Sequence, residues 1–327
     1  MRLVADIGGT NARVALCANG VIDQSSIQRF SNAKWDSLDD VLRAYCSANP
    51  DAVVNEMVIA VAGPVHAGRA TLTNRNWTIM ADDLAQAFTC ERVALLNDLG
   101  ALGYAVPMLG ADQMTKLCGQ DSPGDPNGQA LVVGIGTGFN ISQVITKDQC
   151  IVCPPAEAGH ISMPSAIISA LQDQAFNPDP FPTVETLFSG RGLTAFCRYF
   201  TGLEGVTGEF AINHYGDPGQ PKITRAIDAY AALLGQLLRD FSLSYMPSHG
   251  TFLAGSVGRA IAACAPEPLV NVFHEPCKFR LQSNPAIFVA EEDVAALLGC
   301  AQFLVMAAYL SHLGCNIGTK KNDFGIS

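Results

Sequence analysis

Short apolar runs that end at glycine or polar turns recur through the first hundred residues. Arg2–Ala5 and Ala12–Cys17 flank a glycine-rich turn and are predicted to be neighbouring strands. Met57–Ala62 and Val93–Leu96 are uninterrupted apolar runs, which are typical of fully buried strands. Trp35–Cys46 carries apolar residues at helical spacing. The pattern predicts a sheet that opens with strand, turn and strand and whose later strands are joined by helices.

The same plan returns in the middle of the chain. Ala130–Val133 and Ile141–Ile145 are predicted strands on either side of the turn Gly134–Gly138. At an offset of 128 residues, four positions of the first unit are repeated: Leu3, Val4, Ile7 and Gly8 as Leu131, Val132, Ile135 and Gly136. The repetition suggests two related halves, each presenting a glycine turn to one ligand.

The second half is richer in helical periodicity. Thr251–Ala254 is a predicted strand whose glycine turn opens a helix at Arg259, and Gly202–Lys222 has the composition of a loop. Four segments are predicted helices: Ala166–Phe176, Val184–Phe188, Leu193–Phe200 and Ile223–Met246. Strands mixed with helices and repeated glycine turns indicate an α/β architecture with two lobes.

The last predicted helix, roughly Glu291–Leu313, is the most apolar segment. Its stretch Val294–Leu310 has no charge and is nearly long enough to span a membrane. Because it contains Gln302, Gly299 and several alanines, and no second span exists, we expect a helix buried in a soluble protein.

Composition narrows the class of protein. The net charge is −10, and the 20 basic residues are scattered, so no basic face for nucleic acid or a membrane surface is expected. The 11 cysteines are dispersed, and the amino-terminal residues lack the apolar core of a secretion signal. We therefore expect reduced thiols and a cytoplasmic protein.

The two glycine turns are candidate phosphate sites. In Asp6-Ile-Gly-Gly-Thr-Asn11, adjacent glycines let backbone N–H groups converge on a phosphate, and the Asp6 carboxylate could hold Mg²⁺, through water. An ordinary hairpin with a polar turn is the alternative. Gly134-Ile-Gly-Thr-Gly138 fits neither the dinucleotide fingerprint nor a P-loop, which leaves a phosphate turn between two strands.

Asn97-Asp98 follows a buried strand directly. The carboxyl ends of such strands are where α/β folds place ligands, so Asp98 could accept a proton from a sugar hydroxyl while Asn97 binds the sugar. The alternative is a helix N-cap, a position that favours both residue types.

Pro155-Ala-Glu-Ala-Gly-His160 places a carboxylate and an imidazole three residues apart, and both could bind neighbouring hydroxyls. The alternative is a zinc site that would also use Cys150 and Cys153. Another alternative is a hydrolase, because Ala254-Gly-Ser-Val-Gly258 is close to a nucleophile elbow around Ser256. Against the hydrolase, the possible partners His274 and His312 lie in an extended apolar run and a helical pattern.

Together these motifs resemble the bacterial glucokinase family, within the superfamily that includes hexokinase, actin and Hsp70. The resemblance spans nearly the whole chain. It rests on Asp6–Asn11, Thr73-Asn74-x-x-Trp77, Asn97-Asp98, Gly136–Asn140, Glu157-x-Gly159-His160, Glu185…Ser189-Gly190 and Ala254-Gly255, in this order.

The resemblance implies a role for each matching residue. Asp98 would be the catalytic base that deprotonates the sugar 6-hydroxyl, and Asp6 would serve Mg²⁺. The residues implied to bind the sugar are Asn74, Asn97, Asp98, Glu157, His160 and Glu185. The residues implied to bind ATP are Asp6, Gly8, Gly9, Thr10, Asn11, Gly136, Thr137, Gly138 and Gly255.

The resemblance also implies fold, activity and partners. We expect two ribonuclease-H-like lobes with an active-site cleft between them, a smaller α/β domain of residues 1–108 plus about 300–327 and a larger one of residues 109–299. The expected activity is ATP-dependent phosphorylation of a hexose, with glucose converted to glucose 6-phosphate, in a homodimer. The alternative is a sugar-binding sensor of the same fold that has lost catalysis.

Three positions depart from the family pattern. Asn140 stands where the second phosphate motif usually ends in Gly, Ala158 where Gly is usual, and Ser256 where the adenosine turn usually has a second Gly. The side chain of Asn140 is expected to crowd the nucleotide or to give it an amide contact.

Overall fold

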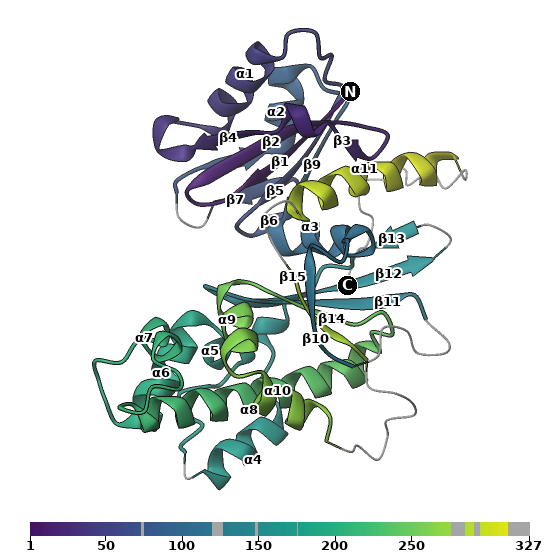
Figure 1. The fold of residues 1–327 in the computed structure, drawn as a ribbon. Coiled ribbons are helices and arrows are strands. Elements are labelled where there is room, and N and C mark those ends of the chain that lie inside the picture. Colours follow the sequence, from purple (N-terminus) through teal and green to yellow (C-terminus); the bar gives the residue numbers. More distant parts are fainter. Residues whose placement is uncertain are drawn as a thin grey trace, which may run out of the picture. The chain divides into compact units, whose positions relative to one another are not determined.

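The computed structural model describes residues 1–72, 75–119, 127–147, 150–174, 176–275, 285–290 and 295–312, with side chains as far as residue 303. The chain forms two compact units. Unit 1 comprises Met1–Tyr104, Asp148–Ile151 and the segment that begins at Ala296, and unit 2 comprises Ala105–Lys147 and Val152–Ala295. Each unit is built around a mixed six-stranded sheet (Figure 1).

In unit 1 the sheet has the order β3-β2-β1-β5-β9, and β4 also pairs with β2. The strands β1, β2, β3 and β4 are antiparallel neighbours, whereas β1, β5 and β9 run parallel. The strands are β1 (Arg2–Ile7), β2 (Asn11–Ala18), β3 (Val21–Ile22), β4 (Gln28–Ser31), β5 (Glu56–Val61) and β9 (Arg92–Asn97). A separate small sheet contains β6 (Val65–His66), β7 (Arg69–Thr71) and β8 (Thr78–Met80).

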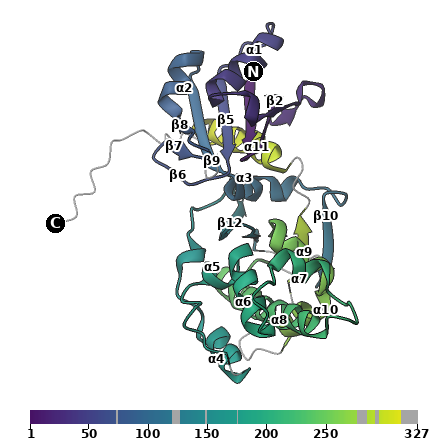
Figure 2. The same ribbon diagram turned by 90° about the vertical axis from the view of Figure 1, so that its left-hand side faces the viewer.

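Helices cover the unit 1 sheet because its strands are apolar on both faces. In Figure 2 the helices α1 (Leu38–Ala48) and α2 (Ala81–Phe88) lie beside the sheet, and residues of both belong to one buried cluster with β1, β2 and β5. The yellow helix α11 (Ala295–His312) also lies against this sheet, where the Cys300 thiol contacts the Ala5 carbonyl oxygen at 3.6 Å (Figure 1). Within the described part of the chain, no helix combines the length and apolar character that crossing a membrane requires.

Unit 2 repeats the core of this plan. Its strand order is β10-β15-β14-β11-β12-β13, with β11 antiparallel to β12 and parallel to β14. The strands are β10 (Met114–Cys118), β11 (Gln129–Ile135), β12 (Phe139–Lys147), β13 (Cys150–Val152), β14 (Thr251–Ala254) and β15 (Ile287–Ala290). The strands β1 and β11 therefore hold equivalent places, as the 128-residue offset predicted, and the α/β fold with two related lobes is confirmed.

The helices of unit 2 pack on its sheet and on one another. They are α4 (Ser165–Asp173), α5 (Val184–Leu187), α6 (Gly190–Thr201), α7 (Gly208–Asn213), α8 (Pro221–Tyr245), α9 (Ser256–Cys264) and α10 (Pro266–Phe273). Tyr230 of α8 and Phe188 and Phe196 beside it are fully buried, and their rings are in contact. The remaining helix of unit 1, α3 (Asp98–Ala105), follows β9 without a loop.

Three sequence predictions for unit 2 are wrong in detail. The predicted loop Gly202–Lys222 contains α7, which was missed because it is short and is set by its cap: the Thr207 hydroxyl accepts a bond from Phe210 N at 3.1 Å. The apolar run before His274 is the helix α10, which starts at Pro266, a residue suited to a first helical turn. The helix after Gly255 begins at Ser256, three residues before the predicted start at Arg259.

Helices α8 and α10 are so close at Gly235 that one added methyl group should destabilise the protein. A Cβ added at Gly235 of α8 would lie 2.2 Å from the Leu269 carbonyl oxygen of α10. We expect Gly235→Ala to lower the free energy of unfolding by about 1–3 kcal/mol, the usual cost of overpacking. Gly205→Ala is the control, because nothing lies within 4 Å of its added Cβ. Urea denaturation measures both, and equal stability of the two variants would contradict the tight packing of α8 on α10.

Candidate active site

The first glycine turn lies at the carboxyl edge of the unit 1 sheet. It joins β1 to β2, and Gly8 N donates to Asn11 O at 2.9 Å. Thr10 is exposed at its tip, and Gly9 and Asn11 are partly buried. The predicted hairpin geometry is therefore present, and the same hairpin exposes a hydroxyl and glycine peptide groups to solvent.

A buried asparagine that the sequence analysis missed holds this turn. Asn32 is fully buried, its Nδ2 donates to Gly8 O at 2.7 Å, and its backbone N donates to Thr10 O at 2.9 Å. The contact spans 24 residues along the chain, so no local pattern could indicate it. Asn32 thus binds two carbonyl groups of the turn and holds the turn in place.

Asp6 precedes the turn and could hold a metal ion. Its side chain is 22% exposed, and Arg13 Nη1 lies 3.7 Å from its Oδ2 across the strand pair. One carboxylate suits Mg²⁺, which commonly keeps several waters and takes its other ligands from phosphate oxygens. Among the described residues, no group of three or more potential ligands is clustered for a metal held by protein alone.

Asn97 and Asp98 lie at the same edge of the unit 1 sheet as the first turn. The parallel register aligns Ile7 with Val61 and Val61 with Asn97. Asn97 Oδ1 accepts a bond from Gly100 N at 2.7 Å, so Asn97 is the N-cap of α3. The cap uses the oxygen of the amide, and its Nδ2 donors can still serve a ligand.

Asp98 is the first residue of α3 and is exposed. Its Oδ1 accepts a bond from Leu99 N at 2.8 Å. The amino end of a helix favours a negative charge, which suits a base that must start ionised. The helix N-cap predicted as an alternative is therefore present, and Asn97 forms it. The cap places the Asp98 carboxylate at the edge of the sheet.

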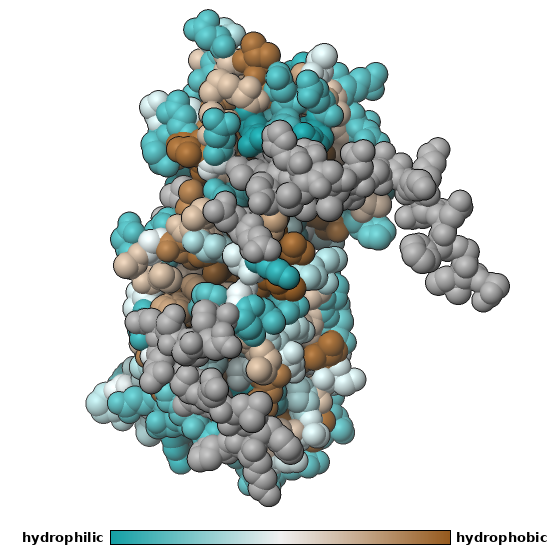
Figure 3. All heavy atoms as spheres, turned by 90° about the vertical axis from the view of Figure 1, so that its right-hand side faces the viewer, coloured by the Kyte–Doolittle hydropathy of each residue, from teal (hydrophilic) through white to brown (hydrophobic). Residues whose placement is uncertain are grey.

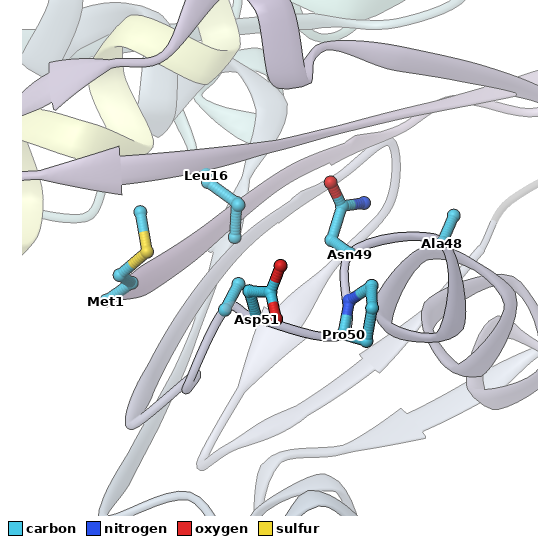
Figure 4. A pocket seen from close by; sticks show the side chains of 7 residues that line it. Met1, Leu16, Ala48, Asn49, Pro50 and Asp51 are labelled. Atoms are coloured by element: carbon cyan, nitrogen blue, oxygen red, sulfur yellow. The ribbon is translucent and has the colours of Figure 1, made fainter.

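The hollow in Figure 4 lies at the opposite edge of the same sheet. Its lining includes Met1, Asn49, Pro50 and Asp51, which lie next to the amino end of β1. Ligands of open α/β sheets bind at the carboxyl ends of the strands, so this hollow is not a candidate for the active site.

The second glycine turn lies beside the amino-terminal ends of two helices in unit 2. Gly190 N, at the start of α6, donates to Gly136 O at 2.8 Å, and a Cβ on Gly136 would lie 4.0 Å from Ser256 N, at the start of α9. Thr137 is exposed between them. Helix amino ends attract anions through their dipoles and unpaired N–H groups, so two of them beside a glycine turn favour a phosphate site.

Gly255 completes this edge. It has φ of +79°, and an added Cβ would lie 2.4 Å from Ile135 O, at the end of β11. The positive φ falls on Gly255 and not on Ser256, which is an ordinary first helical residue. A nucleophile elbow needs the strained residue to be the serine, so the hydrolase interpretation is not supported.

Glu185 is tied to the residue that follows the second turn. Its Oε2 accepts a bond from Phe139 N at 3.1 Å, and its Oε1 pairs with Arg191 Nη2. The Glu185 side chain is 19% exposed and that of Arg191 is 70% exposed. Arg191 was missed by the sequence analysis, and it places a positive charge beside the turn assigned to phosphate.

Glu157 and His160 lie on the loop that packs beside Glu185. His160 belongs to the short 3-10 helix η4 (Ala158–His160), Glu157 precedes it, and both side chains are exposed. A Cβ on Gly159 would lie 2.3 Å from Phe139 O and 3.2 Å from Glu185 Cβ. Glu157, His160, Glu185 and the second turn are therefore gathered in one part of unit 2. Asn74 lies outside the described residues.

The side chain of Asn140 is bound to the loop that carries Glu157. Its Nδ2 donates to Ala156 O at 2.7 Å, and its Oδ1 accepts bonds from Ile141 N and Ala158 N. Both polar atoms of the amide are therefore engaged by backbone groups, two of which lie on the loop that carries Glu157.

The zinc interpretation is also unsupported. Burial raises the pKa of the Cys153 thiol to about 12, which disfavours the thiolate that zinc requires. Cys150 and Cys153, with the seven other cysteines of the described residues, are free thiols.

Comparison with known proteins identifies the family of the chain. The family model described as Glucokinase matches residues 3–307. The glucokinase of Stenotrophomonas maltophilia is 30% identical over 333 residues, which cover 94% of this chain and 94% of that protein. The chain belongs to the glucokinase family.

Solved structures extend the comparison to the fold. The crystal structure of a glucokinase from an Antarctic psychrotroph is 27% identical, has a TM-score of 0.77 and covers 93% of this chain and 98% of that one. A glucokinase of the ROK family from Streptomyces griseus, in complex with glucose and AMPPNP, is 19% identical, with a TM-score of 0.57 and coverage of 92% and 98%. The likeness to the Streptomyces griseus protein shows a shared fold.

Asn97 caps α3 and could also bind a ligand, and the stability of two variants tests the first of these roles. Asn97→Ala removes the cap of α3 and should lower the free energy of unfolding by about 1 kcal/mol. Asn97→Asp keeps an oxygen for Gly100 N and should leave stability close to that of the native chain. Chemical denaturation of both variants is the measurement, and a loss of stability in both would show that the cap is not what Asn97 contributes.

Proposed function

We propose that this chain transfers the γ-phosphoryl group of ATP to the 6-hydroxyl of glucose, forming glucose 6-phosphate and ADP. The observation that carries the proposal is the gathering of a glycine turn, two helix amino ends and two carboxylates in unit 2. Family membership supports the same activity, since the matching relatives are named glucokinases. As a member of this family, the chain is a hexose kinase.

Each group of residues has a part in the reaction. Glu157, His160, Glu185 and Asn97 hold sugar hydroxyls, and the carboxylate of Asp98 accepts the proton of the 6-hydroxyl. The sugar oxygen then forms a bond to the γ-phosphorus while the bond from that phosphorus to the bridging oxygen of ADP breaks. Phosphoryl transfer depends mainly on such positioning and on stabilising the charge of the phosphoryl oxygens.

The phosphate groups are assigned to the two glycine turns. Gly8, Gly9, Thr10 and Asn11 serve in unit 1, and Gly136, Thr137, Gly138 and Gly255 in unit 2. Support for ATP comes from the neighbour solved with AMPPNP and from the helix amino ends beside Gly136. Mg²⁺ would be held through Asp6 and would neutralise charge on the transferred phosphate.

The chain is further proposed to form a homodimer in the cytoplasm. Its proposed domains are residues 1–108 plus about 300–327 and residues 109–299. These proposals rest on the family resemblance and on composition. The free cysteines of the described residues are consistent with a reducing compartment. On the face drawn in Figure 3, the coloured hydrophobic residues lie in small groups among polar ones, as on an ordinary water-exposed surface.

Replacing the proposed base should separate catalysis from binding. We expect Asp98→Asn to lower kcat by about 10²–10⁴-fold while glucose binding persists, because only proton transfer is lost. Asp51→Asn, an exposed aspartate beside the hollow of Figure 4, is the matched control and should keep native kcat. A coupled ADP-release assay gives kcat, and more than about a third of native kcat in Asp98→Asn would remove Asp98 from the role of base.

Glucose should stabilise the protein without any metal. At a hundredfold excess over its Kd, a ligand that binds the native state adds about 2.7 kcal/mol, so a thermal scan with chelator should show a higher Tm. L-glucose at the same concentration is the control. A Tm that rises with Zn²⁺ and stays unchanged with glucose would contradict the sugar site. If the protein binds glucose but forms no ADP from ATP in the presence of any hexose, the sensor alternative is indicated.

A further inference from the structure

Asn140 spans the loop that carries Glu157. Its Nδ2 donates to the carbonyl oxygen of Ala156 at 2.7 Å, and its Oδ1 accepts from the peptide N of Ala158 at 3.0 Å. These are the residues on either side of Glu157. The same Nδ2 lies 3.4 Å from Glu157 Oε2. One amide therefore fixes the backbone before and after the carboxylate and touches the carboxylate itself.

The neighbouring residue makes the equivalent contact to the second carboxylate. Phe139 N donates to Glu185 Oε2 at 3.1 Å, and Phe139 O lies against Gly159 of the same loop. Phe139 and Asn140 are the first two residues of β12 and follow the turn Gly136–Gly138 without a gap. Phe139 and Asn140, which directly follow the turn assigned to phosphate, thus hold Glu185 and Glu157, the two carboxylates assigned to the sugar.

We propose that Asn140 is a positioning residue for glucose, which holds Glu157 in its binding position and links the sugar loop to the phosphate turn. This inference rests on the proposed function. It assigns to position 140 a contact with the sugar side of the site, through Glu157, and no contact with the nucleotide. Because the link is made of short bonds from consecutive residues, a shift of the turn on nucleotide binding also shifts both carboxylates.

Kinetics of two variants test the proposal. Asn140→Ala loses the bonds to Ala156 and Ala158, and we expect the KM and Kd for glucose to rise roughly tenfold, the scale of one or two hydrogen bonds. The Kd for AMPPNP, measured without glucose, should stay at its native value. Asn140→Asp keeps the acceptor for Ala158 N but places a negative charge beside Glu157, so it should weaken glucose binding further than Asn140→Ala does.

Gln143→Ala is the matched control. Gln143 is a partly buried amide on the same strand, and its Nε2 pairs with Gln129 Oε1 at 3.2 Å, away from the loop. Its removal should leave the KM for glucose and the Kd for AMPPNP unchanged. The link itself is measured by calorimetry with and without AMPPNP: the change in glucose Kd that the nucleotide causes in the native chain should shrink in Asn140→Ala.

Each outcome decides a separate question. If the native chain neither releases ADP nor binds glucose, the proposed function fails. If the native chain is active and Asn140→Ala keeps its glucose KM, or shows an altered AMPPNP Kd alone, only the role of Asn140 is overturned. Asn140→Asp has nearly the same volume as the native side chain, so it decides the question if the alanine variant does not fold.

Discussion

The peptide group of Phe139 is the point on which the candidate site of unit 2 depends. Its N–H is bound by Glu185, and its carbonyl lies so close to Gly159 that a Cβ there would be 2.3 Å from the oxygen. Only a glycine fits this contact, since a backbone carbonyl at the start of a paired strand cannot move aside. The peptide group of Phe139 therefore contacts both the loop that carries Glu157 and His160 and the helix that carries Glu185.

Parallel strand pairing provides the corresponding constraint in unit 1. The register that aligns Ile7 with Val61 and Asn97 brings the first turn and the start of α3 to one edge of the sheet. A slip of one residue would turn every side chain of a strand to the other face and bury Asp6 in place of Ile7. The apolar runs of β1, β5 and β9 therefore fix where Asp6 and Asp98 lie, although neither residue is part of the core.

Much of this arrangement could be predicted from the sequence because it is local. Apolar runs that end at Gly8, Gly136 and Gly255 indicated the strands and turns of each unit. Asn140, Asn32 and Arg191 could not be assigned in this way, because the partners of Asn140 and Asn32 lie 16–24 residues away and Arg191 reaches across the start of a helix. For Asn140 the resemblance suggested a phosphate contact, because the residue departs from the pattern of a phosphate motif, and the bonds of its side chain to Ala156 and Ala158 could not be foreseen. The helices α7 and α10 were missed because a cap or a first-turn proline, and not a long periodic pattern, determines where they begin.

An acidic chain that is to hold a triply or quadruply charged nucleotide needs local sources of positive potential. With a net charge of −10, the protein as a whole repels such a ligand. Backbone dipoles provide a local positive potential at the turns. The amino ends of α6 and α9 lie beside Gly136, and Asn32 binds carbonyl groups of the first turn. The arginines that do lie at these places, Arg13 and Arg191, are each paired with a carboxylate, Asp6 and Glu185. Each pair adds little net charge, so in the proposed site oriented peptide groups would provide most of the attraction for phosphate. Such groups are held rigidly by the fold, and phosphoryl transfer benefits from donors that need no reorganisation when charge moves.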